Sequence, residues 1–144
     1  MVIGGSGDAT IRRTADLGDG WLGLFCSPRR YRDTVERILA AAEGRRTAPN
    51  WFGLSTWCGF ASDATRAREL LGGRLESLYR LPAEKFRHVT SAGTPAMVAE
   101  QLAPYVEAGA KHLTVTPVAA SVDEAIEAVA EVRQLLLAAS VATG

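Results

Sequence analysis

The stretch IGGSGDATIRRTADLGDGW, residues 3–21, decides the fold of this chain. It starts with a short apolar run that stops in a glycine-rich turn. A segment with Ile11 and Leu17 at helical spacing follows, and Gly18 ends that segment. A second apolar run then begins at Trp21. A strand, a tight turn, a helix and a new strand in this order form one β/α unit.

The same unit recurs along the chain, and the alternation indicates the α/β class. The strands are expected at Met1–Gly5, Trp21–Phe25, Trp51–Phe60 and His112–Pro117. The helices are expected to begin after side-chain caps in segments 6–8, 27–28, 62–63, 94–95 and 121–124.

Two features of the predicted helices are less regular. Gly72-Gly73 is expected to weaken or bend the third helix, and Gly44 to end the second. Residues 83–91 are expected to form an irregular connection.

The length of the chain limits the size of its fold. A complete (β/α)₈ TIM barrel takes about 250 residues. Residues 1–144 are expected to form a single domain, and they can supply only about half of a TIM-type barrel.

The composition excludes several classes of partner. Lys plus Arg and Asp plus Glu number 16 each, and no basic stripe marks a surface for nucleic acid or anionic lipid. The apolar runs are shorter than the 18 or so residues of a membrane span, and a cytoplasmic location is expected. Cys26 and Cys58 lack metal-binding spacing, so they are interpreted as reduced, partly buried thiols and no metal site is expected.

Three stretches together resemble one family. They are IGGSG at 3–7 with RR at 12–13 and LGDGW at 17–21, GTP at 93–95 followed by VA at 98–99, and YVEAGA at 105–110. In this order they resemble the second half of the barrel of bacterial luciferase-like monooxygenases. The resemblance covers nearly the whole chain and implies that the four strands correspond to strands five to eight of that barrel.

The resemblance also implies a function and sets a limit on it. It implies a flavin- or F420-dependent oxidoreductase or monooxygenase, with FMN and coenzyme F420 not distinguished and a small organic substrate. In this family the first four strands supply much of the substrate chemistry and part of the flavin-binding wall. Activity of this chain alone is therefore not assumed, and no catalytic residue is assigned.

The glycine-rich turn is the candidate cofactor site. Glycines permit close backbone approach, a helix N-terminus favours anions, and Ser6 adds a hydroxyl. By resemblance to the flavin-phosphate site of related barrels, Gly4, Gly5, Ser6 and Gly7 are predicted cofactor contacts, with Thr10 as a second hydroxyl. The alternative interpretation is a capped helix after a tight turn.

The neighbouring residues modify this prediction. Asp8 would oppose an anion unless Arg12 or Arg13 offsets its charge. Trp21 either lines the flavin pocket or belongs to the core, and the core is the more common place for a tryptophan that starts a barrel strand. Nothing near Cys26 in the sequence lowers its pKa, so it is not interpreted as a nucleophile.

Two other functions are compatible with the sequence. A half barrel exposes two strand edges and an apolar sheet face, which predicts a homodimer and allows a non-catalytic, self-associating module. A different phosphate-binding α/β domain, such as a flavodoxin-like fold, would explain the alternation. It would not explain the LGDGW and GTP segments together.

Overall fold

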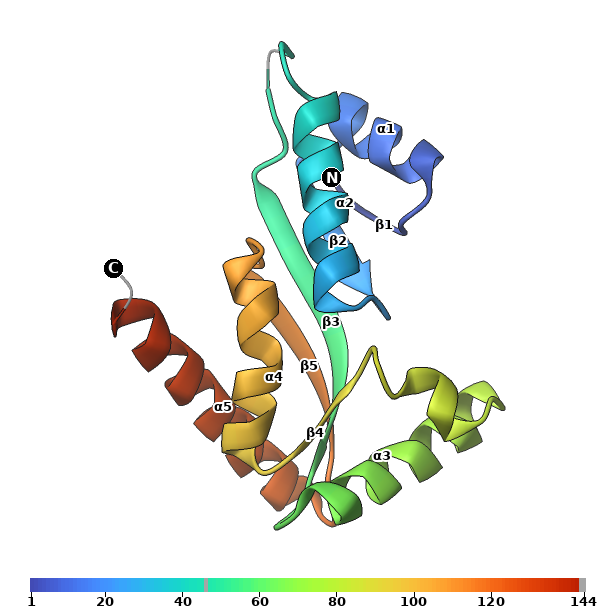
Figure 1. The fold of residues 1–144 in the computed structure, drawn as a ribbon, viewed down its shortest axis with the longest axis vertical. Coiled ribbons are helices and arrows are strands. Elements are labelled where there is room, and N and C mark those ends of the chain that lie inside the picture. The colour runs from blue at the N-terminus through green and yellow to red at the C-terminus, as the bar shows by residue number, and fades with distance from the viewer. Residues whose placement is uncertain (46, 143–144) are drawn as a thin grey trace. The chain divides into compact units, whose positions relative to one another are not determined.

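The computed structural model describes residues 1–45 and 47–142 (Figure 1). Strands and helices alternate along them. In chain order they are β1 (Val2–Gly4), α1 (Asp8–Leu17), β2 (Gly20–Leu24), α2 (Pro28–Ala41), β3 (Trp51–Phe60), α3 (Ala64–Tyr79), the 3₁₀ turn η1 (Ala83–Phe86), β4 (Ser91–Gly93), α4 (Pro95–Glu107), β5 (His112–Val118) and α5 (Val122–Ala142).

The strands pair in the order β1-β2-β3-β4, and β5 also pairs with β3. The pairings of β1 with β2, β2 with β3 and β3 with β4 are all parallel. In the first pair Ile3 lies opposite Trp21, and in the second Trp21 lies opposite Phe52. The α/β class is confirmed, and the four strands expected from the sequence are neighbours in the sheet in the order of the chain.

The connection expected to be irregular contains two ordered elements. The turn η1 begins at Ala83, and β4 pairs with the last residues of β3, with Cys58 opposite Ser91. The expectation of an irregular segment was therefore wrong at both ends of this connection. Strand β4 is only Ser-Ala-Gly, a composition without the β-branched and aromatic residues that mark a strand. Its pairing with β3 defines it instead.

Local caps explain where most helices begin. The Ser27 hydroxyl accepts a hydrogen bond from the Arg30 amide at 3.3 Å, with Pro28 in the first turn of α2. The Asp63 carboxylate accepts one from the Arg66 amide at 2.8 Å at the start of α3. Both caps are those that the sequence predicted.

One end of each of the first two helices differs from expectation. Helix α1 starts from Gly7 with no side-chain cap, so the predicted cap within residues 6–8 was wrong. Helix α2 ends at Ala41, before Gly44. Helix α3 continues through Gly72-Gly73 without a break. Gly72 is buried, and a Cβ there would lie 2.9 Å from that of Ala83, so this glycine permits close packing.

The chain forms two compact units. Residues 1–55 and 104–114 form the first, and residues 56–103 with the segment from 115 onward form the second. The largest fully buried side chains of the first are Trp21, Tyr31, Ile38 and Leu54, and those of the second include Leu71, Leu75, Val98 and Leu102. The expectation of a single domain stays a prediction.

Candidate functional site

The turn after β1 has an open backbone. Gly5 has a φ of +103°, a left-handed conformation that glycine adopts without strain. A Cβ at Gly5 would lie 3.1 Å from the Thr10 hydroxyl, whereas a Cβ at Gly7 would meet no atom within 4 Å. Helix α1 then begins without a side-chain cap, and the first N–H groups of a helix have no intrahelical acceptor. The turn therefore presents backbone donors beside open space.

The side chain of Trp21 holds this turn in place. Its indole N–H donates a hydrogen bond of 2.6 Å to the Gly5 carbonyl. The ring is only 1% exposed and lies 5.0 Å, centroid to centroid, from the ring of Tyr31. Trp21 is therefore a core residue, which was the favoured interpretation. It also links the core of the first unit to the turn.

Side chains from α2 lie beside the turn. The Arg30 guanidinium donates a hydrogen bond of 3.2 Å to the Ser6 hydroxyl. A depression of about 430 Å³ lies here. It is lined by Ser6, Ser27, Arg29, Arg30, Asp33, Thr34 and Arg37. Ser6 precedes α1 and Ser27 caps α2, so two helix N-termini contribute to one polar depression.

The charges around this depression are unequal. Arg37 lies 2.6 Å from Asp8, and Arg29 lies 4.0 Å from Asp33. The hydrogen bond from Arg37, together with its positive charge, lowers the pKa of the Asp8 carboxyl. Among the described residues no carboxylate lies within 4 Å of the Arg30 guanidinium. Arg30 therefore leaves one uncompensated positive charge beside two helix N-termini, an arrangement that favours an anion.

The electrostatic expectation for Asp8 needs correction. The sequence suggested Arg12 or Arg13 as the residue that offsets this carboxylate. In the structure Arg37 of α2 is its ion-pair partner, and Arg12 has only a minor electrostatic effect. Arg12 and Arg13 are one helical turn away on α1 and exposed, whereas Arg37 reaches Asp8 from the neighbouring helix.

The five residues predicted as cofactor contacts lie in different environments. Ser6 lines the depression, and Gly5 and Gly7 form the turn beside it. Gly4 is the last residue of β1, and the side chain of Thr10 packs against Gly5. The prediction missed the arginines of α2. The Ser27-Pro28 cap could have indicated them. It places the next residues at the N-terminus of α2, and α2 follows β2, the strand next to β1.

The other reactive side chains lie outside this depression. Cys26 and Cys58 form no disulfide, and both are more fully buried than expected. Burial raises the pKa of Cys26 to about 11 and that of Cys58 to about 12, so both are protonated thiols at neutral pH. His112 is exposed and stacks on Trp51 with ring centroids 4.6 Å apart. Within the described residues no cluster of three metal-ligating side chains occurs.

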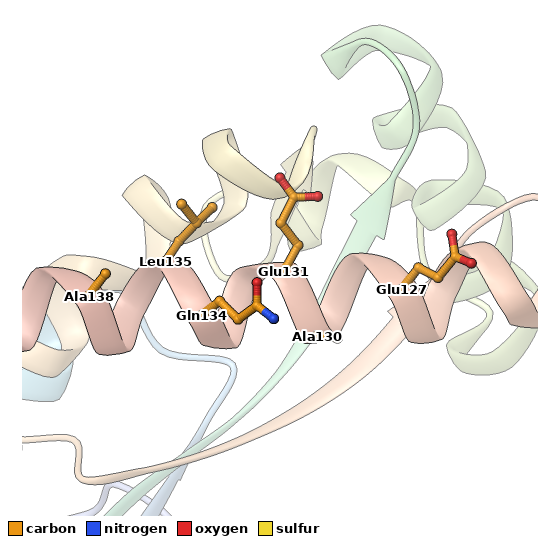
Figure 2. Close-up of a pocket in the computed structure, with 6 residues that line it drawn as sticks. All are labelled: Glu127, Ala130, Glu131, Gln134, Leu135 and Ala138. Carbon is orange, nitrogen blue, oxygen red and sulfur yellow. The ribbon is translucent and has the colours of Figure 1, made fainter.

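An open depression also lies on α5 (Figure 2). Its lining residues are Glu127, Ala130, Glu131, Gln134, Leu135 and Ala138. Figure 2 shows that all of them come from this one helix. No second element contributes a side chain, and both ionisable groups are carboxylates, so this surface is a poor candidate for an anionic cofactor.

Comparison with solved structures defines the class of fold. An F420-dependent secondary alcohol dehydrogenase in complex with an F420-acetone adduct matches with a TM-score of 0.78 at 15% identity, over 94% of this chain and 48% of that chain. The coenzyme F420-dependent tetrahydromethanopterin reductase from Methanopyrus kandleri matches with a TM-score of 0.69 at 14% identity, over 89% and 48%. EDTA monooxygenase from Chelativorans sp. BNC1 matches with a TM-score of 0.64 at 17% identity, over 93% and 43%.

This chain therefore spans about half the length of the solved structures that it matches. The fold is half of a TIM-type barrel, as expected. At these identities the likeness concerns the fold alone. No family model and no curated protein matches the sequence. Among the described helices, none has the length and apolar character needed to cross a membrane.

Proposed function

We propose that this chain is the cofactor-phosphate-binding half of a flavin- or F420-dependent oxidoreductase or monooxygenase of the luciferase-like type. The observation that carries the proposal is the Ser6–Arg30 pair, which joins a hydroxyl and an uncompensated guanidinium at the start of α1. The fold neighbours that act with F420, and the monooxygenase among them, support the same class.

The residues present fit a phosphate group. The Ser6 hydroxyl, the first amides of α1 and the Arg30 guanidinium are all donors, and donors of these kinds bind phosphate oxygens. Gly4, Gly5 and Gly7 keep the backbone accessible, with Thr10 as a further hydroxyl. The cofactor itself supplies the hydride or oxygen chemistry when bound. The residues of this chain bind its phosphate and thereby orient its ring.

Titration with phosphorylated and unphosphorylated flavin tests this proposal. FMN is expected to bind more tightly than riboflavin, which lacks the phosphate. Arg30→Gln removes a charge-assisted hydrogen bond and is expected to weaken FMN binding by about tenfold or more. Flavin fluorescence measures both affinities, and the same titration with F420 shows which cofactor binds more tightly.

Arg32→Gln provides the matched control. Arg32 lies on the same helix, is exposed and does not line the depression. Arg32→Gln removes one positive charge, as Arg30→Gln does, so the two variants have the same net charge. FMN affinity should stay at the wild-type value. If neither FMN nor F420 changes fluorescence at high micromolar concentration, the turn is only a helix start and this half alone is not a cofactor domain.

A second candidate function, self-association, is favoured by the edge of the sheet. Among the described residues strand β1 pairs only with β2, and Met1 and Val2 are 63% and 46% exposed. Two copies would cover each other's sheet edges, with β5 of one beside β1 of the other. The occupant of this edge is then a second copy of the chain.

Size-exclusion chromatography with light scattering tests self-association directly. The expected result is a homodimer at micromolar concentration, because the exposed strand edge and its apolar residues are covered in the dimer. Val2→Lys places a charge on the edge and is expected to shift the equilibrium toward the monomer. A well-folded wild-type species at the monomer mass throughout the micromolar range would refute the homodimer.

A further inference from the structure

A second uncompensated arginine lies in the other compact unit. Arg68 of α3 is half-buried, and no carboxylate among the described residues lies within 4 Å of its guanidinium. A partly buried charge without a counter-ion loses hydration that no ion pair replaces. Burial, followed by the nearby charge of Arg87, lowers the pKa of Arg68. An arginine nevertheless remains protonated at neutral pH.

The orientation of Arg68 is fixed by a short chain of hydrogen bonds. Its guanidinium donates to the Thr90 hydroxyl at 2.9 Å, and that hydroxyl donates to the Phe86 carbonyl at 2.7 Å. Thr90 is buried, so this contact is shielded from solvent. The Thr90 hydroxyl occupies only part of the guanidinium fork, which has five N–H donors. The remaining donors are held in place without a protein counter-ion.

Arg68 lines a depression of about 530 Å³ between α3, β4 and α4. Its lining residues are Ala64, Thr65, Arg68, Glu69, Arg87, Ala92, Met97 and Gln101. All of them belong to the second compact unit. Helix α3 follows directly on the carboxyl end of β3, and ligands of parallel α/β proteins bind at the carboxyl ends of strands.

The acidic groups near this depression have other partners. Glu69 lies 3.4 Å from Arg66, and Glu84 lies 3.7 Å from Arg87. Within each pair the two opposite charges offset one another. Glu84 also acts on Arg68, but its effect on the pKa of Arg68 is smaller than the opposite effect of Arg87, and it forms no ion pair with Arg68. The local balance therefore leaves one net positive charge, that of Arg68, within reach of a ligand.

The rest of the lining is partly polar and partly apolar. Gln101 is held by two hydrogen bonds to the backbone of Ala92, one donated at 3.0 Å and one accepted at 3.2 Å. The Thr65 hydroxyl adds a donor, and Ala92 and Met97 add apolar surface. The depression thus combines a cationic fork with a small apolar wall, which suits an anion that carries a short carbon skeleton.

We propose that the α3–β4–α4 depression binds a small organic oxyanion, a phosphate ester or a carboxylate, through the guanidinium of Arg68. Arg87 and Thr65 add donors at its rim, and Met97 packs against the carbon part. This site shares no residue with the Ser6–Arg30 depression, so it stands whether or not that depression binds a cofactor.

Chemical-shift titration of the 144-residue chain tests the site, with phenyl phosphate and benzoate as probes. At least one probe is expected to give saturable shifts at the amides of Thr65, Ala92 and Met97, and the tighter probe identifies the head group. Arg68→Gln is expected to weaken that binding by about tenfold or more. Arg74→Gln, an exposed position on the same helix, makes the same charge change and should leave it unaltered.

Further variants keep the test decisive. Arg68→Lys keeps the charge but loses the planar guanidinium fork, and Thr90→Val removes the acceptor that orients the guanidinium. Each is expected to weaken binding of the probe. These two variants therefore test the site even if Arg68→Gln does not fold. Arg30→Gln should leave these shifts unchanged, which separates this site from the proposed cofactor site. The absence of saturable shifts with both probes, or wild-type affinity in every folded variant of Arg68 and Thr90, would overturn the proposal.

Discussion

Replacement of Trp21 by alanine is expected to lower the free energy of unfolding by about 3–5 kcal/mol. The ring is 1% exposed, packs against Tyr31 and donates the hydrogen bond that holds the Gly5 carbonyl. Truncation therefore leaves a cavity in the first compact unit and an unpaired carbonyl at the turn. Urea denaturation followed by circular dichroism measures the change.

Tyr31→Phe is the matched control for this experiment. The Tyr31 hydroxyl is buried and has no hydrogen-bond partner among the described residues. Its removal should leave stability unchanged or raise it by about 1 kcal/mol, since no hydrogen bond is lost. A loss below about 1 kcal/mol for Trp21→Ala would show that this ring is not a principal part of the core.

Gly59→Ala is the second substitution with a large expected effect. A Cβ at Gly59 would lie 2.4 Å from the Ala67 carbonyl oxygen and 2.8 Å from the Leu71 Cβ. Both belong to α3, so the helix must move away from β3. Overpacking of this kind is expected to cost about 3 kcal/mol or more, because the obstructing atom belongs to the backbone. The midpoint of urea unfolding measures it.

Gly73→Ala is the matched control on the same helix. A Cβ at Gly73 would meet no atom within 4 Å, and alanine favours a helix interior by about 1 kcal/mol over glycine. This variant should therefore be more stable than the wild type. If both variants changed stability equally, the close approach of α3 to Gly59 would not be the cause.

The sequence predicted the main elements because each has a local signal. Trp51–Phe60 is rich in aromatic and β-branched residues, and Ser27-Pro28 is a cap followed by a proline at the first helical position. Such signals depend only on near neighbours in the chain. They can therefore be identified without knowledge of the tertiary structure.

The candidate site could be predicted only in part. The glycine-rich turn with Ser6 is continuous in sequence, but Arg30 and Arg37 reach it from α2. Their approach depends on the pairing of β1 with β2, which the order of the elements indicates, and on the rotation of α2 about its axis, which local sequence signals do not indicate. The same holds for Arg68, whose contact with Thr90 joins residues 22 positions apart.

The two buried thiols have a practical consequence for labelling chemistry. Maleimides react with the thiolate, and the raised pKa values of Cys26 and Cys58, about 11 and about 12, keep both cysteines in the thiol form at neutral pH. A cysteine introduced at an exposed position would therefore be modified selectively without removal of the native ones. A fluorophore or spin label placed near Ser6, and another near Thr65, would then report on each depression separately in an otherwise unaltered chain.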